Sequence, residues 1–293
     1  MKRIVTGGLI MLLGIFLTAA AVAGDHSHHQ RQKKQGILLV AFGTSVPDAA
    51  SAYQNIERKV TAAYPGIPVR WAYTSPTIRA KLAKKGRFID APQTALAKMM
   101  DEGFTHVAVQ SLHIIPGEEF HRLVQNVRAF TGMAGGFESV RIGHPLLGTQ
   151  KDLERVAAAM IKNIPRERKP ADAVVLMGHG TAHPSNAFYA AMMFHFQQQD
   201  PHIFVGCVEG APEIDAIKEM LLAKKIGKAY LMPFMAVAGD HALNDMAGDE
   251  ADSWKSILTA ADVQCTPVLK GMAEYDDILS IWVDHLGAAL AGF

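Results

Sequence analysis

Two histidines follow hydrophobic runs in the second half of the chain, and glycines flank both runs. His179 comes directly after the run 174–178, and His241 ends the segment 230–241. Imidazole can bind a metal ion or transfer a proton near neutral pH. A histidine just past a buried strand lies where open α/β sheets place their ligand sites. Taken singly, either histidine could instead be a hydrogen-bonded surface residue, so the elements around them matter.

A carboxylate follows the hydrophobic run that lies between these two in the chain. Glu209 ends the segment 205–209. Adjacent parallel strands bring their carboxyl ends to one edge of a sheet, so His179, Glu209 and His241 can converge there. Two imidazoles and a carboxylate suit a first-row divalent ion, and three ligands leave coordination positions open for a working site. We therefore predict that these residues form a catalytic metal site. Glu209 alone could instead cap a helix that begins near residue 212.

The elements that must position these residues alternate along the chain. Short, continuous apolar runs are typical of strands buried on both faces of a parallel sheet. Such runs occupy 36–44, 69–73, 106–111, 139–142, 173–177, 204–208, 228–232 and 263–269. Helical patterns fall between them, over 47–63, 91–102, 118–130, 151–164, 185–198, 212–224, 243–259 and 276–291. The alternation predicts an α/β fold with parallel sheets flanked by helices.

The chain also repeats itself weakly. Residues 40–45 resemble 176–182 when aligned on Gly-Thr, and 107–121 resemble 229–241. Similar order and comparable spacing predict two related α/β halves that arose by internal duplication. A charged, proline-bracketed link at 165–170 marks the boundary, which predicts an N-terminal domain over 36–168 and a C-terminal domain over 169–293 that carries the metal site. The ligand cleft should lie between them.

The first residues have the pattern of an export signal. A basic start, an uncharged run and a small-residue ending predict a signal peptide over 1–23, with a retained membrane anchor as the alternative. Residues 24–35 are polar and predict a disordered leader whose histidines could collect metal ions or simply be solvated. These features predict a periplasmic protein with no stable membrane insertion after cleavage.

Composition narrows the possible partners and chemistry. A formal net charge of +1 gives no support for nucleic-acid binding. Cys207 and Cys265 could pair in an exported protein, although two free thiols are favoured because nothing in the sequence places them within bonding distance. The chain lacks a Walker-type phosphate loop, a nucleophile-elbow serine and a dinucleotide fingerprint, which argues against ATP- or NAD-driven chemistry.

Two further features leave alternatives open. The basic segment 73–87 could hold carboxylates of an anionic ligand through Arg79, or it could be an exposed helix face with its lysines in solvent. His121 borders the apolar stripe of a predicted helix. It is either a surface residue or a ligand at a second site or subunit contact, which leaves a homo-oligomer open.

Taken together, the motifs resemble the anaerobic sirohydrochlorin cobaltochelatases, the single-subunit class II chelatase family. The resemblance rests on residues 36–45, 178–181, 208–212 and 233–241 and extends from residue 36 to the C-terminus. It implies two flavodoxin-like domains with a tetrapyrrole cleft between them, and it maps the family's metal-site residues onto His179, Glu209 and His241. It also implies substrate contacts, which we place at Phe42, Gly43, Thr44, Ser45, Arg79 and Gly180.

The implied activity is that of a lyase that inserts Co²⁺ or Fe²⁺ into sirohydrochlorin without ATP, in cobalamin or haem (porphyrin) biosynthesis. In that reaction His179 would accept a pyrrole proton as general base. An export signal is unusual for tetrapyrrole synthesis, so the protein could serve haem metabolism outside the inner membrane, with bound haem ligated by His121. The alternative from another class is a periplasmic carrier that binds a metal or haem without turnover.

Overall fold

Short apolar runs form the strands of two separate parallel sheets in the computed structural model, which describes residues 31–293. Strand β1 (Gln35–Ala41) begins inside the predicted leader and is buried along nearly its whole length. Lys34 is already anchored, because its backbone N–H donates to the Thr105 hydroxyl (2.8 Å). The predicted signal peptide, and the part of the predicted leader before residue 31, lie outside the described residues.

The first sheet contains β1, β2 (Val69–Tyr73), β3 (His106–Ser111) and β4 (Ser139–Gly143) in the order β2-β1-β3-β4. The second contains β5 (Ala173–Gly180), β6 (Ile203–Glu209), β7 (Lys228–Pro233) and β8 (Gln264–Pro267) in the order β6-β5-β7-β8. All pairings are parallel. The same strand order in both sheets confirms the predicted duplicated α/β fold.

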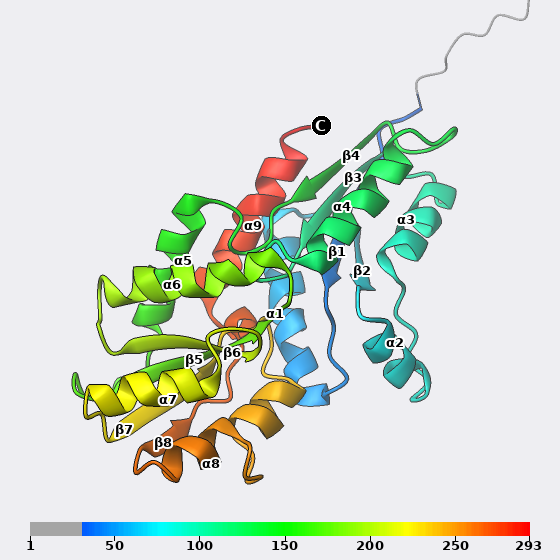
Figure 1. Cartoon of the computed structure of the whole chain (residues 1–293). Coiled ribbons are helices and arrows are strands. Elements are labelled where there is room, and N and C mark those ends of the chain that lie inside the picture. The colour runs from blue at the N-terminus through cyan, green and yellow to red at the C-terminus, as the bar shows by residue number, and fades with distance from the viewer. Residues whose placement is uncertain (1–30) are drawn as a thin grey trace, which may run out of the picture. The chain divides into compact units, whose positions relative to one another are not determined.

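Helices cover the sheets, and the last helix of each half packs across to the other half. The helices are α1 (Pro47–Ala63), α2 (Pro76–Ala83), α3 (Pro92–Asp101), α4 (Glu118–Thr131), α5 (Gln150–Lys162), α6 (Ala187–Gln197), α7 (Ile214–Ala223), α8 (Trp254–Thr259) and α9 (Asp276–Leu290). The C-terminal α9 lies against β3 and β4 of the first sheet, while α5 packs on α6 (Figure 1). The predicted boundary near residue 168 falls between the sheets, but the helix packing does not follow it.

A buried contact between His285 and Asp152 joins the two exchanged helices. His285 of α9 places Nε2 3.1 Å from Asp152 Oδ2 of α5, and both side chains are at most 10% exposed. Thr149 Oγ1 donates to the same carboxylate oxygen (2.7 Å), and His285 Nδ1 donates to the His144 carbonyl (3.1 Å). Buried polar groups persist in proteins when they are hydrogen-bonded in this way.

Two elements differ from the sequence expectation. The helix predicted over 243–259 is instead a π-helical turn (Ala242–Met246) followed by a loop and the short α8. Gly248 ends the turn, where its N–H donates to the Asn244 carbonyl and a side chain would collide with that residue. The basic segment 73–87, for which two alternatives were open, forms α2 over Pro76–Ala83.

The two cysteines are free, as favoured from the sequence. Cys207 lies on β6 and Cys265 on β8, the opposite edges of the second sheet. Neighbouring strands are about 4.8 Å apart, so two intervening strands keep these residues well beyond disulfide reach. Burial raises the pKa of Cys207 to about 12 and that of Cys265 to about 11. Within residues 31–293, no helix combines the length and apolar character needed to cross a membrane.

Candidate functional site

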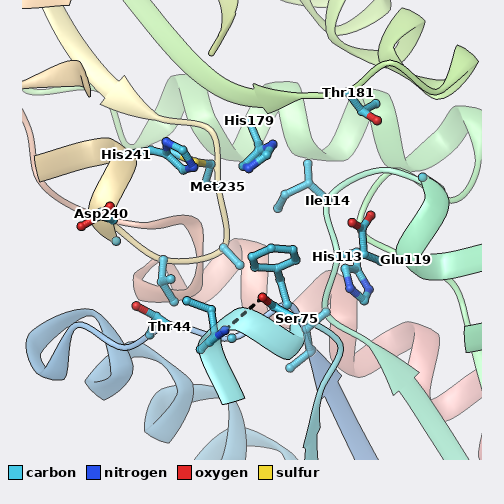
Figure 2. A pocket seen from close by; sticks show the side chains of 18 of the residues that line it. Thr44, Ser75, His113, Ile114, Glu119, His179, Thr181, Met235, Asp240 and His241 are labelled. Atoms are coloured by element: carbon cyan, nitrogen blue, oxygen red, sulfur yellow. Dashed lines mark hydrogen bonds between the residues drawn. The ribbon is translucent and has the colours of Figure 1, made fainter. Parts of the chain in front are cut away.

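A cavity of about 730 Å³ lies where the carboxyl ends of strands from both sheets meet (Figure 2). This is the edge at which parallel α/β sheets place their ligand sites, and the volume falls within the range of small-molecule pockets. Most residues predicted to bind metal or substrate line it: Phe42, Gly43, Thr44, Ser45, His179, Gly180, Glu209 and His241. The prediction that both halves contribute to one cleft agrees with this lining.

His179 is held at the end of β5 with one ring nitrogen left available. Its Nδ1 is 2.9 Å from the Gly180 carbonyl oxygen, which can only accept, so Nδ1 carries the proton. The Nε2 lone pair is then free to bind a cation or to accept a proton. Gly180 adopts φ 78°, and a side chain there would collide with the Glu209 carbonyl, so only glycine permits this turn.

His241 is oriented in the same way by a carboxylate. Its Nδ1 is 2.5 Å from Asp245 Oδ2, one turn later in the π-helical segment. π-helical turns are frequent at functional sites, and a carboxylate on the far nitrogen is the usual support for a metal-binding imidazole. This bond protonates Nδ1 and leaves the Nε2 lone pair of His241 free. The sequence analysis missed Asp245, although a carboxylate four residues after a candidate histidine was a usable signal.

The two imidazoles lie side by side at the cavity wall. Their ring centroids are 4.8 Å apart with an interplanar angle of 89°, and the Phe42 ring is 6.1 Å from that of His179 (Figure 2). Two imidazoles that each engage Nδ1 and leave Nε2 without a hydrogen bond are a donor set for a first-row divalent cation. The structure therefore brings together two of the three predicted ligands.

Glu209 does not complete the expected cluster. Among residues 31–293, no three His, Cys, Asp or Glu side chains are grouped closely enough to hold a metal ion. Glu209 lines the same cavity, but its residue is exposed and its backbone pairs with Gly180 rather than with His179. Glu209 therefore lies opposite the residue after His179, and its carboxylate does not form a common cluster with the two imidazoles. The three-residue site is thus incomplete in this structure.

The part of the cavity wall that the first half of the chain forms contains titratable residues that the sequence analysis did not select. Glu119 and His113 line the cavity, and Figure 2 shows them on the opposite side of His179 from His241. Glu119 follows Ser111, the end of β3, by the same number of residues as His241 follows Pro233, the end of β7. The internal repeat therefore contained the signal that could have identified Glu119.

His113 is a neutral member of this wall. Its Nδ1 is 2.9 Å from the Ser111 hydroxyl and its Nε2 is 3.3 Å from the Thr74 hydroxyl. Desolvation by burial lowers the pKa of His113 to about 4. An imidazole whose two nitrogens already contact hydroxyls is poorly placed to bind a metal, so we assign His113 to the shape of the cavity.

Two predicted residues lie outside the cavity lining. Arg79 is on α2, but Thr77, Ile78 and Lys81 are the α2 residues that face the cavity, and Arg79 Nε is buried without a hydrogen-bond partner. The predicted direct contact between Arg79 and substrate is therefore not supported. His121 is exposed near the start of α4, with its ring centroid 5.1 Å from that of His183.

Two parallel sheets with one strand order around a ligand-sized cavity make this chain a two-sheet α/β protein, the fold seen in solved chelatase structures. SirB from Bacillus subtilis with Fe³⁺ has this fold, with a TM-score of 0.58 at 15% identity over 88% of this chain and 96% of that one. CbiX, described as the terminal enzyme for biosynthesis of sirohaem in denitrifying bacteria, gives a TM-score of 0.51 at 17% identity over 87% and 99%. At these identities the likeness shows the fold.

Sequence comparison identifies the family. The family model for cobalt chelatase (CbiK) matches residues 35–291, and the chain belongs to that family. A sirohydrochlorin cobaltochelatase, CbiKC, from Nitratidesulfovibrio vulgaris is 44% identical over 90% of this chain and 93% of its own length. A sirohydrochlorin cobaltochelatase from Salmonella typhimurium is 38% identical over 88% and 97%, respectively.

Proposed function

We propose that this protein is a sirohydrochlorin cobaltochelatase, an enzyme that inserts Co²⁺ into the tetrapyrrole sirohydrochlorin. The family and the two relatives named for this activity support the reaction and its substrate. The observation that carries the proposal is the imidazole pair. The ring centroids of His179 and His241 lie 4.8 Å apart, and both Nε2 atoms are available inside a cavity of ligand size. Fe²⁺ is a second candidate metal, because the same nitrogen donors suit both ions.

The reaction requires that a metal ion replace two pyrrole protons. The Nε2 atoms of His179 and His241 would hold the incoming cation, and Glu209 at the rim would supply a third ligand after a side-chain rotation. His179 would then accept a pyrrole proton as the metal passes to the macrocycle. Glu119, on the facing wall, is placed to take the second proton. Formation of metal–nitrogen bonds drives this exchange, so no step needs ATP.

Insertion assays with purified protein test the proposal. Sirohydrochlorin changes its visible absorption when metal enters the ring, so Co²⁺ and Fe²⁺ can be compared side by side. We expect turnover in the wild type and its loss in His179→Ala and His241→Ala. Stoichiometric binding of metal or tetrapyrrole without turnover in the wild type would show that the protein is a carrier and not an enzyme.

The two carboxylates are distinguished by matched variants. If Glu209 is a metal ligand, Glu209→Gln weakens Co²⁺ binding measured without tetrapyrrole, whereas Glu119→Gln leaves that binding unchanged and lowers the insertion rate. The reverse result would move the metal site to the facing wall. This comparison decides whether the predicted His179, Glu209 and His241 set forms when the cation binds.

Two further proposals concern the exported form. The pattern of residues 1–23 supports removal of a signal peptide and a periplasmic location, which cell fractionation and N-terminal sequencing of the mature protein test. His121 is exposed and its ring contacts His183, so it is accessible as a haem ligand or as part of a contact between subunits. Identical haem-titration spectra for the wild type and His121→Ala would remove the haem proposal.

A further inference from the structure

The chain has an unusually one-sided stretch of charge beside the cavity. From Arg58 to Ile89 it contains no aspartate or glutamate. Within this stretch, α2 and the turn after it expose Lys81, Lys84, Lys85 and Arg87. None of these four side chains forms an ion pair with any residue between 31 and 293, so their positive charges are not neutralised by the fold itself.

Two other cations, Arg70 within the stretch and Lys98 shortly after it, behave differently. Arg70 pairs with Glu102 (3.0 Å) and Lys98 pairs with Asp90 (2.8 Å). Clustered like charges repel one another, and the protein could have relieved that repulsion here as it does at Arg70 and Lys98. Retained, unpaired positive charge on one short element indicates an anionic ligand rather than a structural role.

The position of α2 places this charge at the cavity. Thr77, Ile78 and Lys81 line the cavity wall, so one face of the helix looks into it. Positions three and four residues further along a helix fall on the same face, and Lys84 still has helical backbone angles. Lys84 therefore continues the face of Lys81 toward the outside, and Lys85 follows it in the exposed turn. The other charged residues of the lining are carboxylates: Glu118, Glu119, Glu209 and Asp240.

The helix is fixed well enough to present these side chains. The Ser75 hydroxyl caps its first turn by accepting a hydrogen bond from the Ile78 N–H (3.3 Å). Leu82 is 1% exposed and anchors the last turn in the core. A rigid helix holds a binding group in place at a lower entropic cost than a mobile loop does.

We propose that α2 and the turn after it, residues 76–87, bind the carboxylate groups of the macrocycle. Lys81 contacts a carboxylate inside the cavity, and Lys84, Lys85 and Arg87 attract the polyanion and hold carboxylates outside it. This inference rests on the proposed function, because sirohydrochlorin is the polyanionic substrate. It also assigns the two substrates to different walls: the tetrapyrrole carboxylates to α2 and the metal ion to His179 and His241.

Binding of metal-free sirohydrochlorin, followed by its fluorescence, tests the inference without turnover. The variants are Lys81→Gln and Lys84→Gln/Lys85→Gln, with Lys224→Gln and Lys162→Gln/Lys224→Gln as controls of equal charge change elsewhere. We expect Lys81→Gln to raise Kd and KM about fivefold to tenfold at unchanged kcat, the loss of one charge-assisted contact. The double variant should raise Kd about threefold and flatten its dependence on salt between 50 and 300 mM, because exposed charges are screened at high ionic strength.

The outcomes separate this inference from the proposed function. Weaker tetrapyrrole binding by the α2 variants supports it even if the wild type inserts no metal, a result that would overturn only the proposed function. If both α2 variants keep the wild-type Kd and salt dependence, the inference about α2 is overturned. Phe88 next to this cluster is 83% exposed, a feature also seen at membrane surfaces. Co-sedimentation with anionic phosphatidylglycerol vesicles that the double variant loses, with tetrapyrrole affinity unchanged, would likewise overturn it.

Discussion

The two halves of the molecule share one topology but place different chemistry at matching positions. Gly43 and Gly180 both adopt positive φ (103° and 78°), and the residues before them are Phe42 and His179. Likewise, the position that holds His241 in the second half holds Glu119 in the first. One backbone plan therefore carries an aromatic ring and a carboxylate in one half and two imidazoles in the other.

This difference teaches how a duplicated fold can handle two unlike substrates. A symmetric cavity would present the same donors on both walls and could not distinguish a metal ion from a macrocycle. In the proposed reaction, the second half supplies the nitrogen donors for the cation. The first half supplies the flat Phe42 ring, the Glu119 carboxylate and Lys81 of α2. If this division is correct, exchanging residues between matching positions should abolish function, whereas conservative changes within one wall should not.

The largest effect is expected when a residue of the second half is replaced by the residue at the matching position of the first half. His179→Phe keeps a planar ring at the position but removes the Nε2 lone pair, so both metal capture and proton acceptance fail. We expect kcat/KM for Co²⁺ insertion to fall about 10³-fold, the usual scale for loss of a general base. Phe42→Leu is the matched control and should raise KM only a few-fold. Equal losses in the two variants would show that the walls do not divide the chemistry.

The second prediction concerns the helices that the halves exchange. His285→Ala removes the ring nitrogen that contacts the buried Asp152 carboxylate, although Thr149 and Arg155 remain close to it. We expect the free energy of unfolding to fall by about 2 kcal/mol, because a buried carboxylate loses one of its hydrogen-bond partners. Urea denaturation measures this change, with His195→Ala on α6 as a control. A loss below that of the control would show that the exchange does not depend on the pair.

The sequence was sufficient to predict the sheets and the histidine pair, for a physical reason. Parallel strands are buried on both faces, so they appear as continuous apolar runs, and ligands gather where those runs end. His179 and His241 follow such runs directly, and their approach in space needs only that β5 and β7 be neighbours. The shared strand order β2-β1-β3-β4 and β6-β5-β7-β8 agrees with the two related halves predicted from the weak internal repeat.

The remaining features depend on details that apolar patterns do not encode. The direction of Glu209 depends on its pairing with Gly180 and on the positive φ of Gly180 and Gly210. The bond from His241 to Asp245 requires a π-helical turn, whereas the sequence pattern of this segment indicated a regular helix. Glu119 is recognised as the counterpart of His241 only when the two halves are aligned residue by residue. Side-chain direction at strand ends is therefore the step that sequence reasoning missed.

A third prediction tests the support of His241 within the second half. Asp245→Asn replaces a carboxylate that can only accept a hydrogen bond with an amide that can also donate one, so the proton of His241 can move to Nε2 and block its lone pair. We expect Co²⁺ affinity and insertion rate to fall about 10- to 100-fold, as for other carboxylates that support metal-binding histidines. The control is Asp240→Asn, which removes the neighbouring carboxylate that accepts a hydrogen bond from the Asn244 side chain. Isothermal titration with Co²⁺ alone should show a lower affinity in Asp245→Asn than in Asp240→Asn. Wild-type affinity in Asp245→Asn would contradict the argument that Asp245 orients His241.

The smallest effect follows from His113, whose matching residue in the second half is Met235; both line the cavity. Burial lowers the pKa of His113 from 6.5 to about 4, so between these pH values the unfolded chain binds a proton that the folded chain does not. Stability should therefore rise with pH across this window and fall as pH drops from 6.5 to 4, by about 1.4 kcal/mol per pH unit at most. His113→Met, which copies the second half, cannot titrate and should lose this part of the slope. Urea denaturation at several pH values compares the two proteins, with His202→Met on the surface as a control. An unchanged slope in His113→Met would mean that other groups carry the pH dependence and that this wall is not set apart by a buried neutral histidine.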